Sequence, residues 1–290
     1  MSYRVRGGFM AAGVSPSPCV VIAVVLSILI GLGAGAQSDT AWMTRTVEVT
    51  IPSKTYPEGR HAWVYTPVGY PESCRGGCNL VLAFDGSQYL MATPLPQTLD
   101  SLTAAKRTAP AVALLFDNGA PPGRIEDLAN THKFAAFVAE ELIPWVRAKY
   151  RVTRDPSRTL ITGSSAGGLG AAYIAMYYPT IFGNVFSQSG AFWRGAEASN
   201  EPPYEWLTEQ FSNLPTLPIK FVLDVGDRET GRALGGQAPS LVEANRHLRA
   251  TLLTKGYSVE YLEVPGGVHS PESWRKRLAA GIVALLPVTR

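Results

Sequence analysis

The chain has 290 residues, of which 46% are hydrophobic and 17% charged, and its formal net charge is +3 at pH 7. This apolar share excludes a mainly disordered chain, and the scattered lysines and arginines give a nucleic-acid partner little support. Three cysteines are too few for a disulfide-rich scaffold, and no repeated CxxC or HExxH sequence predicts a zinc site.

The first 36 residues have the order of a secretory signal peptide. Two arginines precede a strongly apolar run at 19–32, and a small-x-small cleavage site ends at Ala36. We therefore predict that residues 1–36 are removed and that 37–290 form a secreted or periplasmic protein. The alternative is an uncleaved inner-membrane anchor, although the apolar run is shorter than the ~20 residues that a spanning helix needs.

Two cysteines remain after this cleavage. Cys74 and Cys78 are separated by Arg-Gly-Gly, and an oxidising compartment would allow them to close a small loop. We predict a structural disulfide, with two free thiols as the alternative. Its stabilising effect should be small, because a short loop constrains few conformations of the unfolded chain.

Short apolar runs then alternate with helical patterns, and no internal repeat is present. This order predicts a single α/β domain whose mostly parallel central sheet carries helices on both faces. The expected strands are 46–51, 62–66, 80–84, 111–116, 159–162, 184–187, 220–225 and 259–264.

Three helices are marked by apolar residues at helical spacing. They are expected over 131–150, where Pro144 should introduce a kink, and over 240–255 and 271–286. The proline-rich stretch 196–218 is interpreted either as a lid over a site or as a surface excursion.

One motif indicates catalysis. Residues 163–167, Gly-Ser-Ser-Ala-Gly, form a G-x-S-x-G sequence between an apolar strand and a helix expected at 169–178. Ser165 has glycine two residues before and after it, whereas Ser164 has Thr162 in the earlier place. A nucleophile on a strained strand-to-helix turn needs those small neighbours, so Ser165 is the predicted nucleophile.

A serine hydroxyl needs a general base near pH 7, and in an α/β-hydrolase the acid and then the histidine follow the serine in the chain. His247 falls inside an amphipathic helix, whereas His269 lies in a loop after a strand, so His269 is the predicted base. The acid should follow the strand at 220–225, where Asp227 and Glu229 are both candidates.

Two backbone N–H groups should bind the oxyanion of the transition state. Ala166 follows the nucleophile and supplies one. The other is expected from the loop at 85–88, where Gly86 permits close approach and Ser87 is the preferred donor. An ordinary turn at the end of the strand is the alternative.

Several of these segments resemble the enterochelin-esterase (ferric-siderophore esterase) branch of the putative-esterase α/β-hydrolases, relatives of esterase D. The resemblance covers about residues 45–286. The segments that carry it are Phe84-Asp85-Gly86, Arg124–Leu128, Glu141-Leu142-Ile143-Pro144, Gly163–Gly168, Ser187-Gln188-Ser189-Gly190 with Trp193, Gly226–Glu229, Asn245, and His269 with Trp274-Arg275.

The resemblance implies roles for further residues. It favours Glu229 over Asp227 as the acid, and implies that Arg124 binds an anionic, catechol-bearing substrate while Trp193 lines the pocket. The alternatives are an ion pair of Arg124 with a neighbouring carboxylate, Asp127 or Glu126, and a core position for the tryptophan. The sequence departs from the family where Val268 is inserted before the histidine.

The resemblance also implies a function: hydrolysis of a triscatecholate siderophore such as enterobactin, with iron arriving on the substrate and no metal or organic cofactor in the chemistry. A carbohydrate acetyl or feruloyl esterase and an acyltransferase are the alternatives within the fold. A non-catalytic binding protein is the alternative outside enzymes. The expected partner is a small-molecule ester, with no nucleic acid and with membrane attachment only through the N-terminus.

Overall fold

The computed structural model describes residues 40–120, 122–129, 131–197 and 199–288. The expected signal peptide and its cleavage site lie outside the described residues. Within these described ranges, no helix is both long enough and apolar enough to cross a lipid bilayer.

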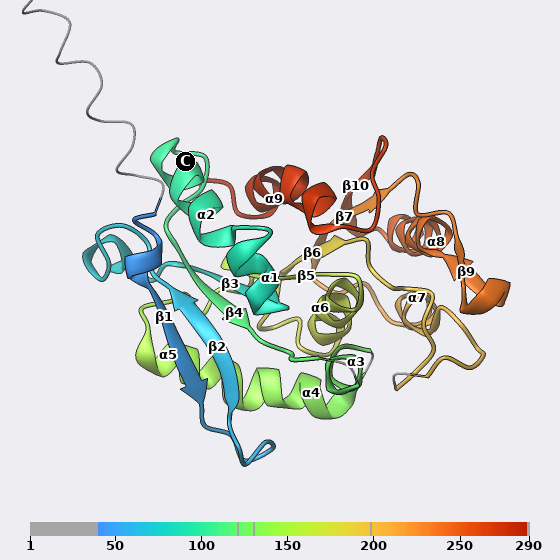
Figure 1. The fold of residues 1–290 in the computed structure, drawn as a ribbon, viewed down its shortest axis with the longest axis horizontal. Helices are drawn as coiled ribbons and strands as arrows, with labels where there is room; N and C mark the ends of the chain where they lie inside the picture. The colour runs from blue at the N-terminus through green and yellow to red at the C-terminus, as the bar shows by residue number, and fades with distance from the viewer. Residues whose placement is uncertain (1–39, 121, 130, 198, 289–290) are drawn as a thin grey trace, which may run out of the picture. The chain divides into compact units, whose positions relative to one another are not determined.

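Eight strands form the central sheet (Figure 1). The first two pairings in the sheet are antiparallel and the other five are parallel. The spatial order is β1 (Thr46–Ile51), β2 (Arg60–Tyr65), β4 (Ala111–Phe116), β3 (Asn79–Phe84), β5 (Thr159–Ser164), β6 (Asn184–Gln188), β7 (Lys220–Gly226) and β10 (Ser258–Val264). A separate two-stranded ribbon is formed by β8 (Arg232–Ala233) and β9 (Ala238–Ser240).

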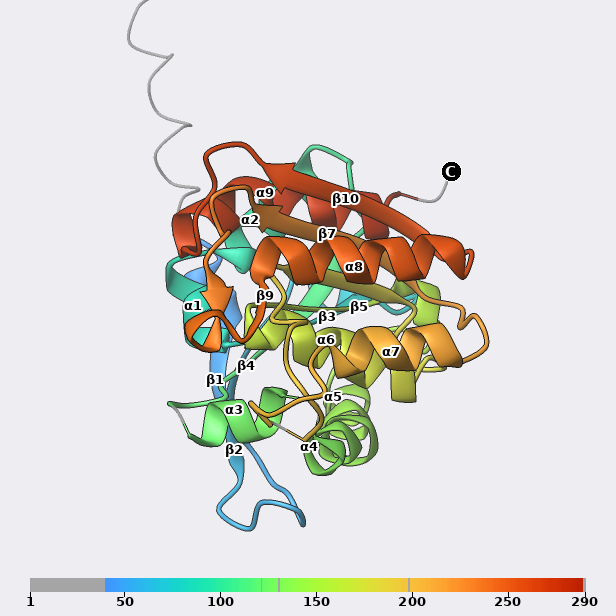
Figure 2. The ribbon, with the colours of Figure 1, turned by 90° about the vertical axis from the view of Figure 1, so that its right-hand side faces the viewer.

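Helices cover both faces of this sheet (Figures 1 and 2). One face carries α1 (Gly86–Met91), α2 (Leu95–Ala104) and α9 (Pro271–Leu285). The other carries α3 (Gly123–Leu128), α4 (His132–Phe137), α5 (Ile143–Lys149), α6 (Ala166–Tyr177), α7 (Trp206–Asn213) and α8 (Leu241–Thr254). The expected fold class, a mostly parallel sheet between two helical layers, is confirmed.

The position of β3 in the middle of the sheet explains why its sequence is continuously apolar. Leu80, Leu82 and Phe84 pack into the core on the α6 face, whereas Val81 and Ala83 pack into the core under α2 and α9. Successive side chains of a strand point to opposite faces, and here both faces are covered. Every residue of β3 is consequently buried.

The helix expected over 131–150 is divided into three parts. Between α4 and α5 the backbone is π-helical over Val138–Leu142, and the N–H of Ile143 donates to the carbonyl of Val138. Pro144 follows directly and has no N–H to donate. Where a kink at Pro144 was expected, the helix has a π-helical turn that begins before the proline.

The stretch 196–218 contains a helix, α7, that the sequence pattern did not indicate. Its Leu207 and Phe211 are buried, and the ring of Phe211 packs edge-on against Phe221 and Tyr257 at centroid distances of 5.5 and 5.7 Å. The second half of this stretch is therefore a packed part of the helical layer.

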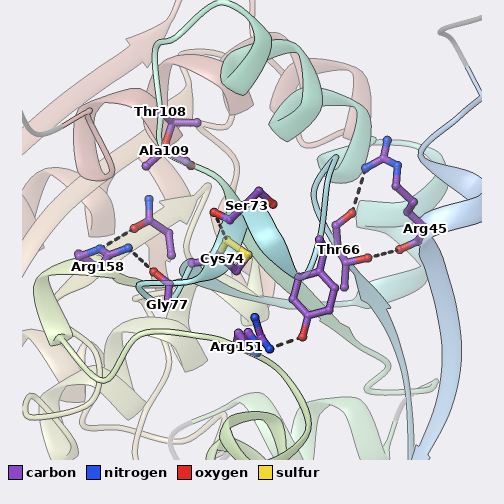
Figure 3. Close-up of a disulfide and its surroundings, with 12 residues drawn as sticks. Arg45, Thr66, Ser73, Cys74, Gly77, Thr108, Ala109, Arg151 and Arg158 are labelled. Atoms are coloured by element: carbon purple, nitrogen blue, oxygen red, sulfur yellow. Dashed lines mark hydrogen bonds between the residues drawn. A yellow bond between two sulfur atoms is a disulfide. The ribbon is translucent and has the colours of Figure 1, made fainter.

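Cys74 and Cys78 form a disulfide, and both residues are buried. The bridge lies immediately before β3, at the N-terminal edge of the parallel strands (Figure 3). Arg158 supports this loop, since its Nη2 donates to the carbonyl of Gly77 at 2.6 Å and its Nε to Asn79 Oδ1 at 3.0 Å.

Candidate functional site

The opposite edge of the sheet gathers the polar residues that the sequence singled out. Ser165 follows β5, Ser189 follows β6, Glu229 follows β7 and His269 follows β10. These four strands are parallel neighbours, so their C-terminal ends lie side by side along one edge. This is the edge at which open α/β sheets bind their ligands.

Ser165 occupies a strained turn between β5 and α6. Its backbone has φ 58° and ψ −120°, a conformation that residues other than glycine rarely adopt. The backbone of Gly163 lies so near the next turn that a Cβ there would be 2.5 Å from the carbonyl carbon of Gly167. Glycine at position 163 is thus required for the turn to close.

Ser164, the other serine of the motif, faces away from solvent. Its side chain is buried, and its hydroxyl accepts a hydrogen bond from Gln88 Nε2 at 2.9 Å. Ser165 is only half-buried. No hydrogen bond joins the Ser165 hydroxyl to His269 among the described residues; such bonds often tighten only when a substrate binds.

His269 and Glu229 form a close pair. The imidazole Nδ1 lies 2.6 Å from Glu229 Oε2, with 39% of the histidine side chain exposed but only 3% of the glutamate. Burial alone would raise the pKa of Glu229, but hydrogen bonds from His269, from the Ser189 hydroxyl and from the Gly226 N–H outweigh burial and lower it. Glu229 is therefore held as an anion beside the imidazole.

Asp227, the alternative acid, lies on the surface. Its side chain is exposed, and its backbone N–H donates to the carbonyl of Val264 at 3.1 Å. Of the two candidate carboxylates, the structure brings Glu229 to the imidazole.

The two expected oxyanion donors both lie in the first turn of a helix. Ala166 is the first residue of α6 and Ser87 the second residue of α1. The sequence predicted a loop at 85–88; instead, α1 begins at Gly86, directly after Asp85 in the left-handed conformation (φ 56°). N–H groups in a first helical turn have no partner within the helix, so both are available as donors.

The segment that carries Ser87 is fixed from two sides. The N–H of Asp85 donates to Asn118 Oδ1 at 3.2 Å, and a Cβ added at Gly86 would lie 2.5 Å from the backbone of Leu115. A Cβ added at Gly167 would lie 3.2 Å from Asp85 Oδ2, so this segment lies against the first turn of α6.

Arg124 has a different partner from either carboxylate considered from the sequence. Its Nε and Nη2 donate to the two oxygens of Asp85 at 2.5 and 2.6 Å, whereas Asp127 pairs with Arg60. The expected alternatives, Asp127 and Glu126, are wrong because the fold places α3 across the end of β3. Arg124 thus also braces the segment that carries Ser87.

Trp193 lies half-buried after β6 and packs against the core. The guanidinium of Arg194 stacks on its ring, with Cζ 4.6 Å from the ring centroid. Burial and the charge of Arg124 lower the pKa of Arg194. The positive charge of Arg124 therefore acts on Arg194, although Arg124 itself is paired with Asp85.

His247, the other histidine that follows Ser165 in the chain, is more exposed than His269. It lies exposed on α8, where its Nδ1 is 2.8 Å from Glu205 Oε1. Within the ranges that the structure covers, no group of three or more histidine, cysteine or acidic side chains could hold a metal ion.

Sequence reasoning assigned no role to three residues that the structure places around this site. Ser189 and Trp274 contact the Glu229–His269 pair directly, and Asn118 holds Asp85. Ser189 directly follows a strand at the same edge as the serine motif, and that position was the available signal.

Comparison with known proteins shows the family and similar esterases. A family model described as "Putative esterase" matches residues 53–285. The iron(III) enterobactin esterase of Escherichia coli O6:H1 (strain CFT073) is 29% identical over 256 residues, which are 88% of this chain and 60% of that protein. The acetyl esterase of Caldicellulosiruptor saccharolyticus is 26% identical over 189 residues, 58% of this chain and 69% of that protein.

A solved structure is similar as well. The enterobactin esterase of Shigella flexneri, crystallised in the presence of 2,3-dihydroxy-N-benzoyl-glycine, has a TM-score of 0.70 at 28% identity, over 83% of this chain and 59% of that one. The chain thus spans about three fifths of the length of these enterobactin esterases. The resemblance that the sequence motifs indicated is confirmed.

Proposed function

The chain belongs to the putative esterase family, and from this premise we propose that it hydrolyses carboxylic esters with Ser165, His269 and Glu229 as its catalytic groups. The observation that carries the proposal is the 2.6 Å contact between a buried, anionic Glu229 and His269, on the sheet edge that also holds the strained Ser165. Enzymes that transfer acyl groups use this combination of nucleophile, base and orienting acid.

The proposed reaction has two halves. His269 Nε2 takes the proton of the Ser165 hydroxyl as its oxygen attacks the ester carbonyl, and Glu229 stabilises the imidazolium that forms. The N–H groups of Ala166 and Ser87 bind the oxyanion. The tetrahedral intermediate expels the alcohol, which receives the proton from His269, and a water molecule then releases the acid by the same steps.

We propose a triscatecholate siderophore ester, such as enterobactin, as the substrate. The names of the similar enterobactin esterases support this choice. So do the guanidinium groups of Arg124, which lies beside Asp85, and of Arg194, which lies over Trp193, since catecholates are anionic when they bind iron. A carbohydrate acetyl ester is the second candidate, and the similarity to an acetyl esterase favours it.

The decisive experiment is hydrolysis by purified residues 37–290, with products separated by chromatography. The substrates are a cyclic tricatecholate ester with and without iron, a feruloylated sugar, an acetylated xylan fragment and p-nitrophenyl acetate. We expect preference for the tricatecholate and loss of all turnover in Ser165→Ala. Activity that survives in this variant would refute the nucleophile, and turnover restricted to acetyl esters would refute the siderophore.

We further propose that the protein is exported and that residues 1–36 are cleaved. The basic, apolar and small-residue order of this segment supports the proposal, as does a disulfide between Cys74 and Cys78. Expression of the full chain followed by mass spectrometry of the purified protein tests it. A mature N-terminus at residue 37 is expected, and an intact N-terminus in the membrane fraction would refute cleavage.

A further inference from the structure

Ser189 has no part in the mechanism above, yet its hydroxyl lies beside Glu229. Ser189 follows β6 directly and is almost completely buried. Its backbone has φ 49°, which is unfavourable for a residue with a Cβ, and its N–H donates to the carbonyl of Asp224 at 2.7 Å. A strained backbone at this position presents the serine hydroxyl to the acid of the site.

The donor and acceptor roles around this hydroxyl are fixed by chemistry. Trp274 Nε1 lies 2.9 Å from Ser189 Oγ, and an indole nitrogen can only donate. The hydroxyl hydrogen of Ser189 is therefore free to point at Glu229 Oε1, which is 2.7 Å away. The N–H of Gly226 donates to the same oxygen at 2.8 Å. Glu229 Oε1 thus accepts from two donors, and these hydrogen bonds favour the ionised carboxylate.

We infer that Ser189 is a positioning residue: its hydroxyl passes a hydrogen bond from Trp274 to Glu229 and so holds His269 in one tautomer. This inference rests on the proposed function. With Oε1 occupied by donors, Oε2 accepts the Nδ1–H of His269. The Nε2 lone pair is then left to take the proton of Ser165.

Trp274 also contacts Gln188 and His269, apart from its hydrogen bond to Ser189. Its carbonyl accepts a hydrogen bond from Gln188 Nε2 at 2.9 Å, and its ring meets the His269 ring edge-on at a centroid distance of 5.0 Å. The first turn of α9 is therefore joined to the end of β6 by two hydrogen bonds, one from the indole N–H of Trp274 and one to its carbonyl. One serine hydroxyl connects this support to the acid.

The charged groups around Glu229 come from three elements. Asp224 on β7 is buried, and the negative charge of Glu229 raises its pKa. His269 lies in the loop after β10. The positive charge of Arg277 on α9 lowers the pKa of Asp224. All three are unchanged by a substitution at Ser189. A change in pH dependence can therefore be read as the loss of the hydroxyl.

The test compares Ser189→Ala with Ser187→Ala in otherwise intact residues 37–290. Both variants lose one buried hydroxyl from the same segment, but the hydroxyl of Ser187 has no hydrogen-bond partner among the described residues. The measurements are kcat and KM for the preferred ester from pH 5 to 9, and the proton resonance of the His269 Nδ1–H.

In Ser189→Ala we expect kcat to fall about tenfold with KM unchanged, because one hydrogen bond to a charged group is lost. The carboxylate loses a donor and becomes a stronger base, so the acid limb of the pH profile should move upward by about half a pH unit or more. The Nδ1–H resonance should shift or broaden. Ser187→Ala should match the parent in all three measurements.

A third variant tests whether Trp274 acts on Glu229 through the Ser189 hydroxyl. Trp274→Phe keeps a ring beside His269 but removes the indole donor, and it should lower kcat less than Ser189→Ala. The double variant should be no slower than Ser189→Ala alone, since the tryptophan acts through the serine.

A Ser189→Ala variant whose rate, pH profile and resonance match those of Ser187→Ala would overturn the inference. The proposed function fails separately, if the parent hydrolyses no ester or if Ser165→Ala remains active. In that case the Nδ1–H resonance, which needs no turnover, decides whether Ser189 holds the imidazole.

Discussion

At the scale of single residues, two buried carboxylates near the end of β7 have pKa values shifted in opposite directions. Glu229 accepts hydrogen bonds from His269, Ser189 and the Gly226 N–H, and these lower its pKa despite burial. For Asp224, burial dominates and raises the pKa to about 7, against a single hydrogen bond from Gln188 at 3.3 Å. Deeper burial and fewer donors together keep Asp224 protonated, whereas three donors keep Glu229 charged.

The first prediction concerns the identity of the acid. Glu229→Gln should lower kcat by at least about a hundredfold, or ~3 kcal/mol in the transition state. Since Oε1 faces two donors, the new amide nitrogen would face His269 Nδ1 and favour the wrong tautomer. Asp227→Asn, a change of the same kind on an exposed side chain, should leave kcat near that of the parent. Equal losses in the two variants would contradict the assignment.

The second prediction concerns stability. The pKa of Asp224 is raised above its ordinary value of 3.8 to about 7, so the folded protein retains a proton that the unfolded chain has lost between these pH values. Asp224 therefore stabilises the fold most below pH 4, and this contribution disappears as the pH rises to 7. Asp224→Asn cannot ionise and should be more stable than the parent above pH 7, by roughly 1–3 kcal/mol.

Urea unfolding at pH 5 and pH 8.5 measures this difference in the free energy of unfolding. The advantage of Asp224→Asn should be larger at pH 8.5. Asp227→Asn serves as the control, because its exposed side chain should give the same small difference at both values. An advantage that does not grow with pH would mean that the charge of Asp224 in the folded protein does not change between pH 5 and pH 8.5.

At the scale of elements, the beginnings of helices decide the chemistry. The expected helix after the serine motif began at 169, but α6 begins at Ala166, directly after Ser165. A helix also begins at Gly86, where a turn was expected. Both helices direct the positive ends of their dipoles and their free N–H groups toward the end of the sheet.

The third prediction tests the second of these helix starts. A Cβ at Gly86 would lie 2.5 Å from the backbone of Leu115, which cannot move without distorting β4. Gly86→Ala should therefore lower both kcat and stability, the latter by about 1–3 kcal/mol. Gly123 also begins a helix, but nothing lies within 4 Å of its Cβ position, so Gly123→Ala should be neutral in urea unfolding and in ester hydrolysis. Parent-like activity in Gly86→Ala would mean that Ser87 does not bind the oxyanion.

The strands could be predicted more completely than the helices. Short apolar runs located all eight strands of the sheet, with boundaries that differ from the structure by at most two residues. Short helices such as α1 and α3 were missed, because six residues give too little periodicity to separate a helix from a turn. The π-helical turn before Pro144 follows from packing of the whole segment and has no pattern of its own.

At the scale of the whole molecule, the disulfide and the candidate site lie at opposite edges of the sheet. The bridge precedes β3, whereas Ser165, Glu229 and His269 follow the C-terminal ends of their strands. The fourth prediction is that the double variant Cys74→Ala/Cys78→Ala loses stability but not catalysis. Closure of so short a loop contributes roughly 2 kcal/mol.

Urea unfolding and ester hydrolysis, each with and without a reductant, check this prediction. Reduction should lower the unfolding midpoint of the parent and leave that of the double variant unchanged. A large loss of kcat on reduction would contradict the separation of the bridge from the site.

The sequence by itself determined the strands, the serine turn and the family, and it predicted His269 as the base, because local patterns of apolar residues, glycines and chain order encode them. Only the tertiary structure decided which groups meet. The contact of Glu229 with His269, the pairing of Arg124 with Asp85, and the hydrogen bonds of Ser189 join residues from different elements. Spacing along the chain carries no record of such contacts; the order and direction of the strands bring them together.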